Sequence, residues 1–335
     1  MGRGGVSLTR KTVVVAGCFA AAIIAMVFSP GIGLQTITLH DLLSDEQARF
    51  IFTTLRLPRM VTAFFAGGCL AVCGLIYQAI FRNPLADPFT LGISSGASLG
   101  AALCILGGIS GTVAGMSFIT AGAFAGALAA MAVIYVFALS NESDSATILL
   151  AGVVVTTVCS GAIMFIHVIG GVHKSYQILR WLMGAVDGVA AQNAVMMIVP
   201  LLALLTVAVL FMPQLDLLST GDTLAHSRGI NIRNAKLLFI SITTVMIATT
   251  VSVCGPIGFI GIIAPHACRM MLPGTRHRLL ALCSFLTGGT FLIITDTIAR
   301  SVAPPSEIPV GIITSLCGGP FFLIVLYRLK RRLLL

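Results

Sequence analysis

Few side chains in this 335-residue chain could carry out chemistry, and most of them lie in apolar surroundings. The segment Gly92-Ile93-Ser94-Ser95-Gly96 has the Gly-x-Ser-x-Gly spacing that exposes a nucleophilic serine on a strand-to-helix turn. Here it opens an apolar helical stretch instead, and no histidine and aspartate are evident as partners. An intramembrane hydrolase would need a nucleophile and a base facing each other, so we expect no enzyme activity from this chain.

The sequence also lacks the motifs that would supply energy for transport. A P-loop requires a lysine between glycine and Ser or Thr, but none of the four lysines follows a glycine. Ion-coupled transporters keep carboxylates near the bilayer midplane. Of the eleven acidic residues only Asp296 falls within an apolar stretch, near its end, and Arg300 four residues later favours a local ion pair. A transporter of this kind needs an outside energy source.

Cysteine and histidine do not form a ligand pattern. The nine cysteines are odd in number, lie almost entirely in apolar stretches and include no C-x-x-C pair, which is typical of small packed side chains. His167 and His173 remain open as haem or metal ligands, although packing explains single histidines at helix ends more simply. We therefore expect no metal site and no resident cofactor.

The composition requires lipid as the solvent for much of the surface. Hydrophobic residues make up 57% of the chain and charged residues only 9%, against about 25% charged in a soluble domain. A helix needs about 20 apolar residues to cross the hydrocarbon core. Ten stretches meet or approach this length, and we predict spans over 12–29, 60–81, 90–108, 112–139, 146–168, 191–212, 235–254, 256–272, 279–299 and 308–328.

The basic residues predict an orientation. With a cytoplasmic N-terminus, 14 of the 20 Lys and Arg residues lie on the inside and 6 on the outside. Ten spans then place both termini in the cytoplasm. The net charge of +9 is thus interpreted as membrane topology and not as nucleic-acid binding. The first apolar run is long for a signal peptide and shows no clear cleavage site, so we expect it to stay as a helix.

Glycines recur every four residues in the third and fourth spans. Gly92, Gly96 and Gly100 form one such series, and Gly122 and Gly126 form another. Because glycine has no Cβ, a stripe of this kind lets helix backbones approach closely in lipid. The pattern predicts a tightly packed helix bundle but no particular function.

Three long motifs, in the same order along the chain, resemble one family. The first motif runs from Arg56-Leu57-Pro58-Arg59 through Gly74 and Gln78 to Arg82-Asn83-Pro84-Leu85-Ala86-Asp87-Pro88 and Leu91-Gly92-Ile93-Ser94-Ser95-Gly96-Ala97. The second comprises Gly255-Pro256-Ile257-Gly258-Phe259-Ile260-Gly261, Pro265-His266 and Arg269. The third comprises Asp296-Thr297-Ile298-Ala299-Arg300, Glu307-Ile308-Pro309-Val310-Gly311-Ile312 and Gly319-Pro320-Phe321-Phe322. Together they are similar to the FecCD/BtuC-type permeases of iron–siderophore, haem and cobalamin importers.

The resemblance implies an all-α polytopic membrane protein with about ten transmembrane helices in one domain, residues 1–335. It implies a multi-pass permease of the bacterial inner membrane, surrounded by lipid, that pairs with a second copy. Two cytoplasmic ATPase subunits and an extracytoplasmic substrate-binding protein would complete an ATP-binding-cassette importer, with no role for nucleic acid. A secondary transporter or channel for a small organic solute is the alternative, and the sequence does not name the cargo.

On the cytoplasmic side, the resemblance assigns two sets of residues. The loop 216–233 would form the coupling helices that dock on the ATPase, and its candidate residues are Gly221, Asp222, Leu224, Ala225, Arg228 and Gly229. Asp222 is placed to cap a short helix and Gly229 to end it. Asn83 and Leu85 would narrow the cytoplasmic exit, with Ser145 in the companion constriction.

On the outside, three arginines stand at the ends of predicted spans. The resemblance implies that Arg56, Arg59 and Arg300 receive acidic residues of the binding protein, since an arginine fork holds a carboxylate with two hydrogen bonds. Snorkelling to lipid headgroups is the simpler alternative. An outer segment over 178–184 includes Arg180 and Met183 as candidates along the ligand path. There Arg180 or Lys174 could attract an anionic cargo, whereas Trp181 is expected at the lipid interface.

Overall fold

Ten long helices make up most of the computed structural model. It describes residues 8–333 apart from 34–35, 110, 114, 140–144, 188, 190 and 304–305. Within this part the long helices are α1 (Leu8–Phe28), α4 (Leu57–Ile80), α5 (Ile93–Gly107), α6 (Phe118–Leu139), α7 (Ser145–Leu182), α8 (Ala191–Leu218), α10 (Ile232–Cys254), α11 (Ile260–Met271), α12 (His277–Ala299) and α13 (Val310–Leu333). The smaller elements are α2 (Leu39–Ser44), α3 (Glu46–Phe50), α9 (Asp222–Ser227), two 3₁₀ turns over Ser29–Gly31 and Pro88–Leu91, a π-helical segment over Ile51–Arg56, and an antiparallel hairpin of β1 (Thr112–Val113) and β2 (Met116–Ser117).

Each long helix occupies one predicted span, which confirms the all-α polytopic fold. Seven of the described helical stretches are long and apolar enough to cross a membrane. The helices α5 and α13 contribute shorter apolar stretches, and α11 has only 12 residues.

Two predicted boundaries are wrong for local reasons. The fourth helix begins at Phe118 and not at Thr112, because Gly111 and Gly115 adopt positive φ values that shape the β1–β2 hairpin. The fifth helix continues to Leu182, with a kink at Gly171, whose φ of 71° and ψ of 172° lie outside the helical range. The predicted outer segment is therefore the last part of α7.

The second span also starts earlier than predicted, because helical turns continue upstream of Pro58 to Glu46. Pro58 has no N–H, so the carbonyl of Thr54 loses its usual helical donor. A π-helical segment over Ile51–Arg56 accommodates this loss, and the N–H of Leu57 bonds to the carbonyl of Phe52. Proline therefore alters the helix here without ending it.

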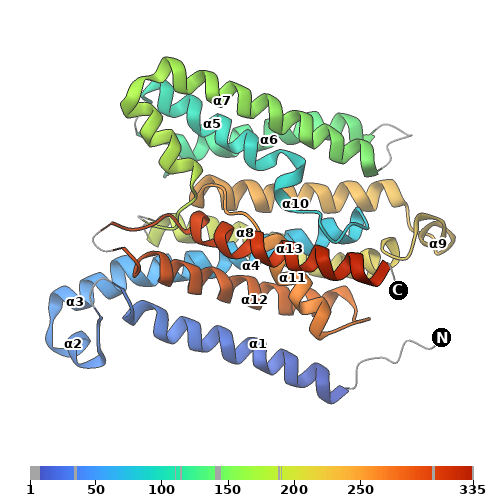
Figure 1. The fold of residues 1–335 in the computed structure, drawn as a ribbon, viewed down its shortest axis with the longest axis horizontal. Helices are drawn as coiled ribbons and strands as arrows, with labels where there is room; N and C mark the ends of the chain where they lie inside the picture. Colours follow the sequence, from blue (N-terminus) through green and yellow to red (C-terminus); the bar gives the residue numbers. More distant parts are fainter. Residues whose placement is uncertain are drawn as a thin grey trace.

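The helices run between two distinct ends of an elongated bundle (Figure 1). The start of α1 and the end of α13 lie at the same end as α9, and α2 and α3 lie at the opposite end. We call these the α9 end and the α2 end. Both described limits of the chain lie at one end, as an even number of passes requires.

The helix α4 forms the centre of the bundle, since 20 of its 24 residues are buried, whereas Ala22 is the one buried residue of α1. It packs on α12 through glycines. A Cβ on Gly67 would collide with the carbonyl oxygen of Gly288, and a Cβ on Gly288 would lie 2.6 Å from the carbonyl oxygen of Gly67. The predicted glycine stripe behaves in the same way between α5 and α6, where Gly96 and Gly100 lie against Gly126 and Gly122.

A second proline inside a helix explains an otherwise unusual arginine contact. Pro213 in α8 cannot donate to the carbonyl of Val209, four residues earlier. The guanidinium of Arg278, at the start of α12, donates to that carbonyl at 3.3 Å and to the carbonyl of Leu210 at 3.3 Å. Arg278 therefore joins α8 to α12 and satisfies a carbonyl that the helix leaves without a donor.

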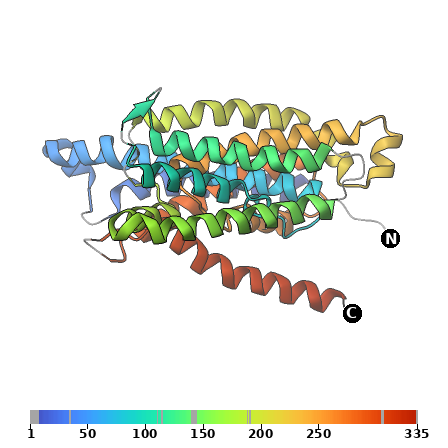
Figure 2. The same cartoon turned by 90° about the horizontal axis from the view of Figure 1, so that it is seen from above.

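Several helices, among them α7 and α13, present wide apolar faces that the rest of the bundle does not cover. Figure 2 shows α13 leaning away from the other helices toward its C-terminal end. Large exposed apolar side chains on α13 are Leu316, Leu323, Ile324 and Tyr327, and those on α7 include Val158, Met164, Phe165, Val168 and Val172. In a membrane such faces are covered by lipid or by another protein.

Candidate transport site

An ion-pair cluster closes the α2 end between α4 and α12. Nε of Arg59 lies 3.0 Å from both carboxylate oxygens of Asp296, and Nη2 lies 2.8 Å from Oδ1. Nη1 of the same guanidinium donates to Glu307 at 2.6 Å. The Asp296 side chain is 3% exposed, whereas that of Glu307 is 45% exposed. Arg59 therefore holds the start of α4 to the end of α12 and to the segment that precedes α13.

The expected local pair between Asp296 and Arg300 is the weaker interaction. Nε of Arg300 lies 3.9 Å from Asp296, while Arg59 takes both carboxylate oxygens. Arg300 is buried and donates to the carbonyl and hydroxyl oxygens of Ser29 at the end of α1. The Arg59–Asp296 pair was missed because the sequence shows which residues are neighbours along one helix but not which distant helix packs against them.

The third arginine of this end is partly exposed. Nη1 of Arg56 donates to the carbonyl of Pro30 at 2.8 Å, and its guanidinium also packs against Gly33. Arg56, Arg59 and Arg300 thus gather around the ends of α1, α4 and α12, and their docking role stays a prediction. They differ in exposure, because Arg59 and Arg300 are largely enclosed by their internal partners.

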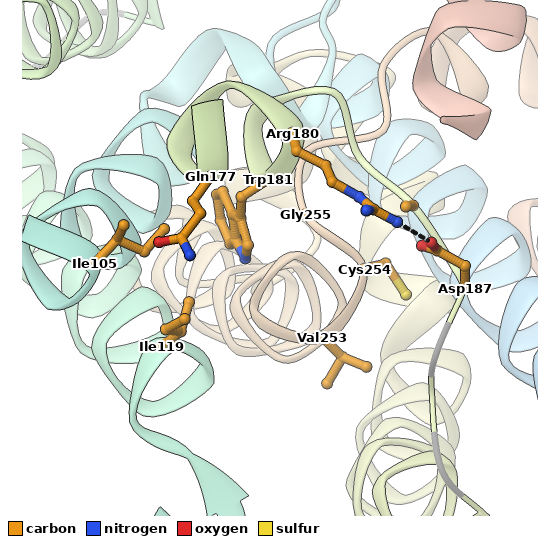
Figure 3. A pocket seen from close by; sticks show the side chains of 10 residues that line it. Ile105, Ile119, Gln177, Arg180, Trp181, Asp187, Val253, Cys254 and Gly255 are labelled. Atoms are coloured by element: carbon orange, nitrogen blue, oxygen red, sulfur yellow. Dashed lines mark hydrogen bonds and ion pairs between the residues drawn. The ribbon is translucent and has the colours of Figure 1, made fainter. Parts of the chain in front are cut away.

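A pocket of about 390 Å³ lies at the same end, beside the last turns of α7 (Figure 3). This volume falls within the range of about 300–1,000 Å³ that is usual for small-molecule sites. Four helix ends supply its walls, and the lining residues are Ile105, Ile119, Gln177, Arg180, Trp181, Ala185, Asp187, Val253, Cys254 and Gly255. Figure 3 shows Ile105 and Ile119 on one side of the pocket and the Arg180–Asp187 pair on the other.

The charge at this pocket is paired but accessible. Nη2 of Arg180 lies 3.0 Å from Oδ2 of Asp187, and the arginine side chain is 63% exposed. An exposed ion pair of this kind is worth only about 0–1 kcal/mol. An anionic ligand can therefore compete with Asp187 for Arg180 at small cost.

The other residues of the predicted outer segment have different surroundings. Trp181 lines the pocket and packs on the bundle core with part of its ring surface, and its place at the lipid interface stays a prediction. Met183 is absent from the pocket lining, and its carbonyl instead packs against Gly311 of α13. Nζ of Lys174 donates to the carbonyl of Leu106 at 2.6 Å, which places this ammonium at the end of α5.

The end of α7 is bonded to two other helices. The N–H of Ala185 donates to the carbonyl of Cys254 at 2.8 Å, and the N–H of Gly311 donates to the carbonyl of Gly184 at 3.2 Å. Gly184 has a φ of 67°, and a Cβ there would collide with the carbonyl of Pro256. After the kink at Gly171, α7 therefore continues to Leu182, and the residues that follow it are bonded to the end of α10 and the start of α13.

At the opposite end, α9 stands beyond the bundle between α8 and α10 (Figure 1). Leu224 is 57% exposed, while Ala225 is completely buried against the core. Gly221, with a φ of 128°, precedes the helix, and the N–H of Gly229 bonds to the carbonyl of His226 just after it. Arg228 is exposed at the end of α9. Asp222 begins the helix, but its side chain lies outside the described part.

Two side chains attach the base of α9 to the bundle. Asp216, near the end of α8, accepts hydrogen bonds from the N–H of His277 at 2.9 Å and from Nδ1 of His277 at 2.6 Å. Asp216 thereby satisfies one of the free N–H groups at the start of α12. Nη2 of Arg82 donates to the carbonyl of Leu218 at 3.3 Å. Sequence reasoning found neither contact, because each joins residues that are far apart along the chain.

The loop 82–91 carries two of the expected gate residues at this end. Oδ1 of Asn83 accepts from the N–H of Leu85 at 3.0 Å, which closes a tight turn, and both side chains are half-buried. Ser145 begins α7, but its side chain and the residues 140–144 before it lie outside the described part. Burial raises the pKa of Asp87, in the same loop, to about 7, although the N–H of Phe89 donates to its carboxylate.

Within the described part of the chain, no three His, Cys, Asp or Glu side chains gather in a way that could hold a metal ion. Nε2 of His173 lies 3.1 Å from the side-chain amide nitrogen of Gln177, and the hydroxyl of Ser175 donates to the carbonyl of His167.

The chain is similar to known proteins along nearly its whole length. A family model described as the FecCD transport family matches residues 13–328. The hemin transport system permease protein HmuU of Yersinia pestis is 37% identical over 305 residues, which cover 90% of each chain. The cobalamin import system permease protein BtuC of Halobacterium salinarum is 39% identical over 284 residues, or 84% of this chain and 74% of that protein.

A solved structure agrees with the sequence matches. An inward-facing conformation of a metal-chelate type ABC transporter superposes with a TM-score of 0.83 at 28% identity, covering 95% of this chain and 99% of that one. The fold, the order of the helices and the sequence motifs therefore point to the same group of membrane permeases. The chain belongs to the FecCD transport family.

Proposed function

We propose that this chain is the permease subunit of an ATP-binding-cassette importer that carries an iron–siderophore complex, haem or cobalamin across the bacterial inner membrane. A separate ATPase would drive alternating access. Support for the cargo class comes from the names of the relatives, which transport hemin and cobalamin, and from the metal-chelate type of the similar structure. The bundle itself provides surfaces suited to each partner.

The observation that carries the proposal is the position of α9. A six-residue helix with an exposed Leu224 stands beyond the bundle at the end opposite the pocket. An exposed leucine on a short projecting helix suits a groove of a soluble partner. In the proposed orientation α9 and both termini are cytoplasmic, where the ATPase binds. The positive-inside rule supports the same orientation.

At the α2 end, the arginines and the pocket serve delivery and entry of the cargo. Arg56 offers a partly exposed guanidinium to an acidic residue of the binding protein. Arg59 and Arg300 fix the helix ends around it through Asp296 and Ser29. Next to this surface, Arg180 stands over a mostly apolar pocket, which suits an anionic chelate with an apolar face.

A second permease copy would cover the apolar faces of α7 and α13, and lipid would cover α1. The residues of α13 that lean away from the bundle are then those that meet the partner. Asn83 and Leu85 would form the exit of the path between the two copies at the α9 end. In this arrangement the pocket and the exit lie at opposite ends of the translocation path.

Hydrolysis of ATP tests the assignment of roles. The chain purified alone should hydrolyse no ATP, whereas the complex with its ATPase should hydrolyse ATP and respond to the binding protein. Titration of the binding protein with haem, cobalamin and ferric siderophores, followed by fluorescence, should identify the cargo. Robust hydrolysis by the isolated permease would contradict the proposal.

A further inference from the structure

A buried polar contact joins α11 to α4 near the α9 end of the bundle. Pro265 lies inside α11 and has no N–H, so the carbonyl of Gly261, four residues earlier, lacks its helical donor. Gln78 of α4 supplies the missing donor, because its Nε2 lies 3.0 Å from the oxygen of Gly261. Gln78 is 3% exposed. Because the contact is buried, removal of the amide would leave this carbonyl without a ready partner.

Arg269 sets the orientation of the Gln78 amide. Nη1 of Arg269 donates to Oε1 of Gln78 at 2.8 Å, and Nη2 lies 3.5 Å from the carbonyl of Leu75. The amide oxygen therefore faces the guanidinium, and the amide nitrogen faces Gly261. The position requires a side chain that donates and accepts at once, which glutamine does and glutamate as a carboxylate does not.

Gly261 is also where α11 meets the loop 82–91. A Cβ on Gly261 would lie 2.5 Å from Cδ of Pro88 and 2.9 Å from Oδ1 of Asp87. On its other side, a Cβ on Gly74 of α4 would collide with the Gly261 carbonyl oxygen. One residue of α11 thus lies between the central helix and the loop that carries Asn83 and Leu85.

The first turn of α11 is strained, so it depends on such contacts. Phe259 precedes the helix with a φ of 69°, a left-handed conformation that is costly for a phenylalanine. Its ring packs directly on Gly318 of α13. A segment in this conformation persists only where the surroundings fix it, and the Gln78 contact lies within the next turn.

We propose that Gln78 is a positioning residue for the gate at the α9 end: its amide holds the Gly261 carbonyl that Pro265 leaves without a donor, and so fixes the loop 82–91 against α11. This role rests on the proposed function, because the loop 82–91 can act as a gate only if the chain is a permease with a translocation path.

A double-mutant cycle on the purified chain tests the contact itself. Gln78→Ala should lower the thermal midpoint by several degrees. Pro265→Ala restores an N–H that can donate to Gly261 within the helix, so Gln78→Ala should cost less than half as much in that background. Gln78→Glu should behave like Gln78→Ala, because it keeps an acceptor for Arg269 but loses the donor. Thr62→Val, a buried change elsewhere in α4, serves as the control.

Thiol accessibility tests the positioning role without requiring a known cargo. In inside-out vesicles, labelling of Leu85→Cys by a membrane-impermeant maleimide, above the background of the native cysteines, should rise severalfold with Gln78→Ala or Gln78→Glu. The added Pro265→Ala change should reverse this rise. Unchanged labelling in both single variants, or wild-type stability of Gln78→Glu, would overturn the role of Gln78. Neither assay measures transport, so a failure of the role of Gln78 can be distinguished from a failure of the importer assignment.

Discussion

At the scale of single residues, the Arg59–Asp296 pair explains how the α2 end keeps its shape. Two nearly buried charges hold each other through two hydrogen-bonded oxygens, and Glu307 shares the same guanidinium. Removing one member of a buried pair leaves the other charge without compensation. The cost is about 3–5 kcal/mol.

Asp296→Asn should therefore destabilise the permease strongly, by about 3–5 kcal/mol. Glu307→Gln is the matched control, because that carboxylate is 45% exposed and should cost only about 1 kcal/mol or less. Thermal unfolding of the purified variants in one detergent compares the two. Small and equal shifts of the thermal midpoint in the two variants would show that the Arg59–Asp296 pair does not stabilise the α2 end.

A second residue-scale prediction concerns pH. Burial raises the pKa of the Asp87 carboxyl to about 7 in the folded state. In the unfolded chain the pKa of an aspartate is about 3.9. Between these values the folded state binds more protons, so stability must fall as pH rises, by at most about 1.4 kcal/mol per pH unit.

The free energy of unfolding of wild type minus that of Asp87→Asn should accordingly decline from about pH 5 to pH 7 and level off above about pH 8. Chemical denaturation in detergent across this range measures the difference, in which other titrating groups cancel. A difference that is flat or rises with pH would mean that the folded carboxyl is ionised throughout.

At the scale of elements, the sequence predicted the helices better than their ends. Apolar runs located all ten long helices, seven of which lie in stretches long and apolar enough to cross a membrane, because a bilayer demands length and composition that nothing else in the chain provides. The π segment before Pro58 and the continuation of α7 past Gly171 to Leu182 were missed, since each depends on the local conformation of one or a few backbone groups. The glycine series Gly96 and Gly100 was interpreted correctly, because close helix contact needs only the missing Cβ.

Two neighbouring residues of α9 have different surroundings, because Leu224 is exposed and Ala225 is buried in the core. Leu224→Asp should reduce co-purification with the ATPase at least tenfold without affecting folding, because the side chain is exposed. Ala225→Asp should instead destabilise the permease itself, since it buries an unpaired charge in the core. Affinity purification of the co-expressed complex, with thermal unfolding alongside, measures both effects. Normal ATPase retention by Leu224→Asp would rule out α9 as the main contact.

The candidate site was only partly visible in the sequence. Arg180 and the three outer arginines were identified from motifs and span ends. Asp187, Gln177 and Cys254 of the pocket carry no local signal, because the pocket exists only where four helix ends converge. The Asp216–His277 and Gln78–Gly261 contacts were likewise not predictable, since their partners lie on separate helices.

At the scale of the whole molecule, the account requires a binding protein at the α2 end. Arg56→Glu should weaken its association with the assembled transporter at least tenfold, and the wild-type affinity should fall as salt is added. Arg59 is unsuitable for this test, because its loss also breaks the contact with Asp296. Arg49→Glu, an exposed change on α3, is the matched control. The measurement is the affinity of the binding protein for the reconstituted complex across a salt series. Equal affinity for the Arg56→Glu and Arg49→Glu complexes would contradict docking through Arg56.

The most direct test is uptake of cargo by proteoliposomes that contain the permease and its ATPase. The cognate binding protein, loaded with the cargo that it binds, is added outside, and ATP is enclosed on the side of α9. Accumulation should require ATP, the ATPase and the binding protein together, and Leu224→Asp should abolish it while Arg49→Glu leaves it intact. Accumulation by the permease alone, driven by an ion gradient or by diffusion, would contradict the assignment to an ATP-driven importer.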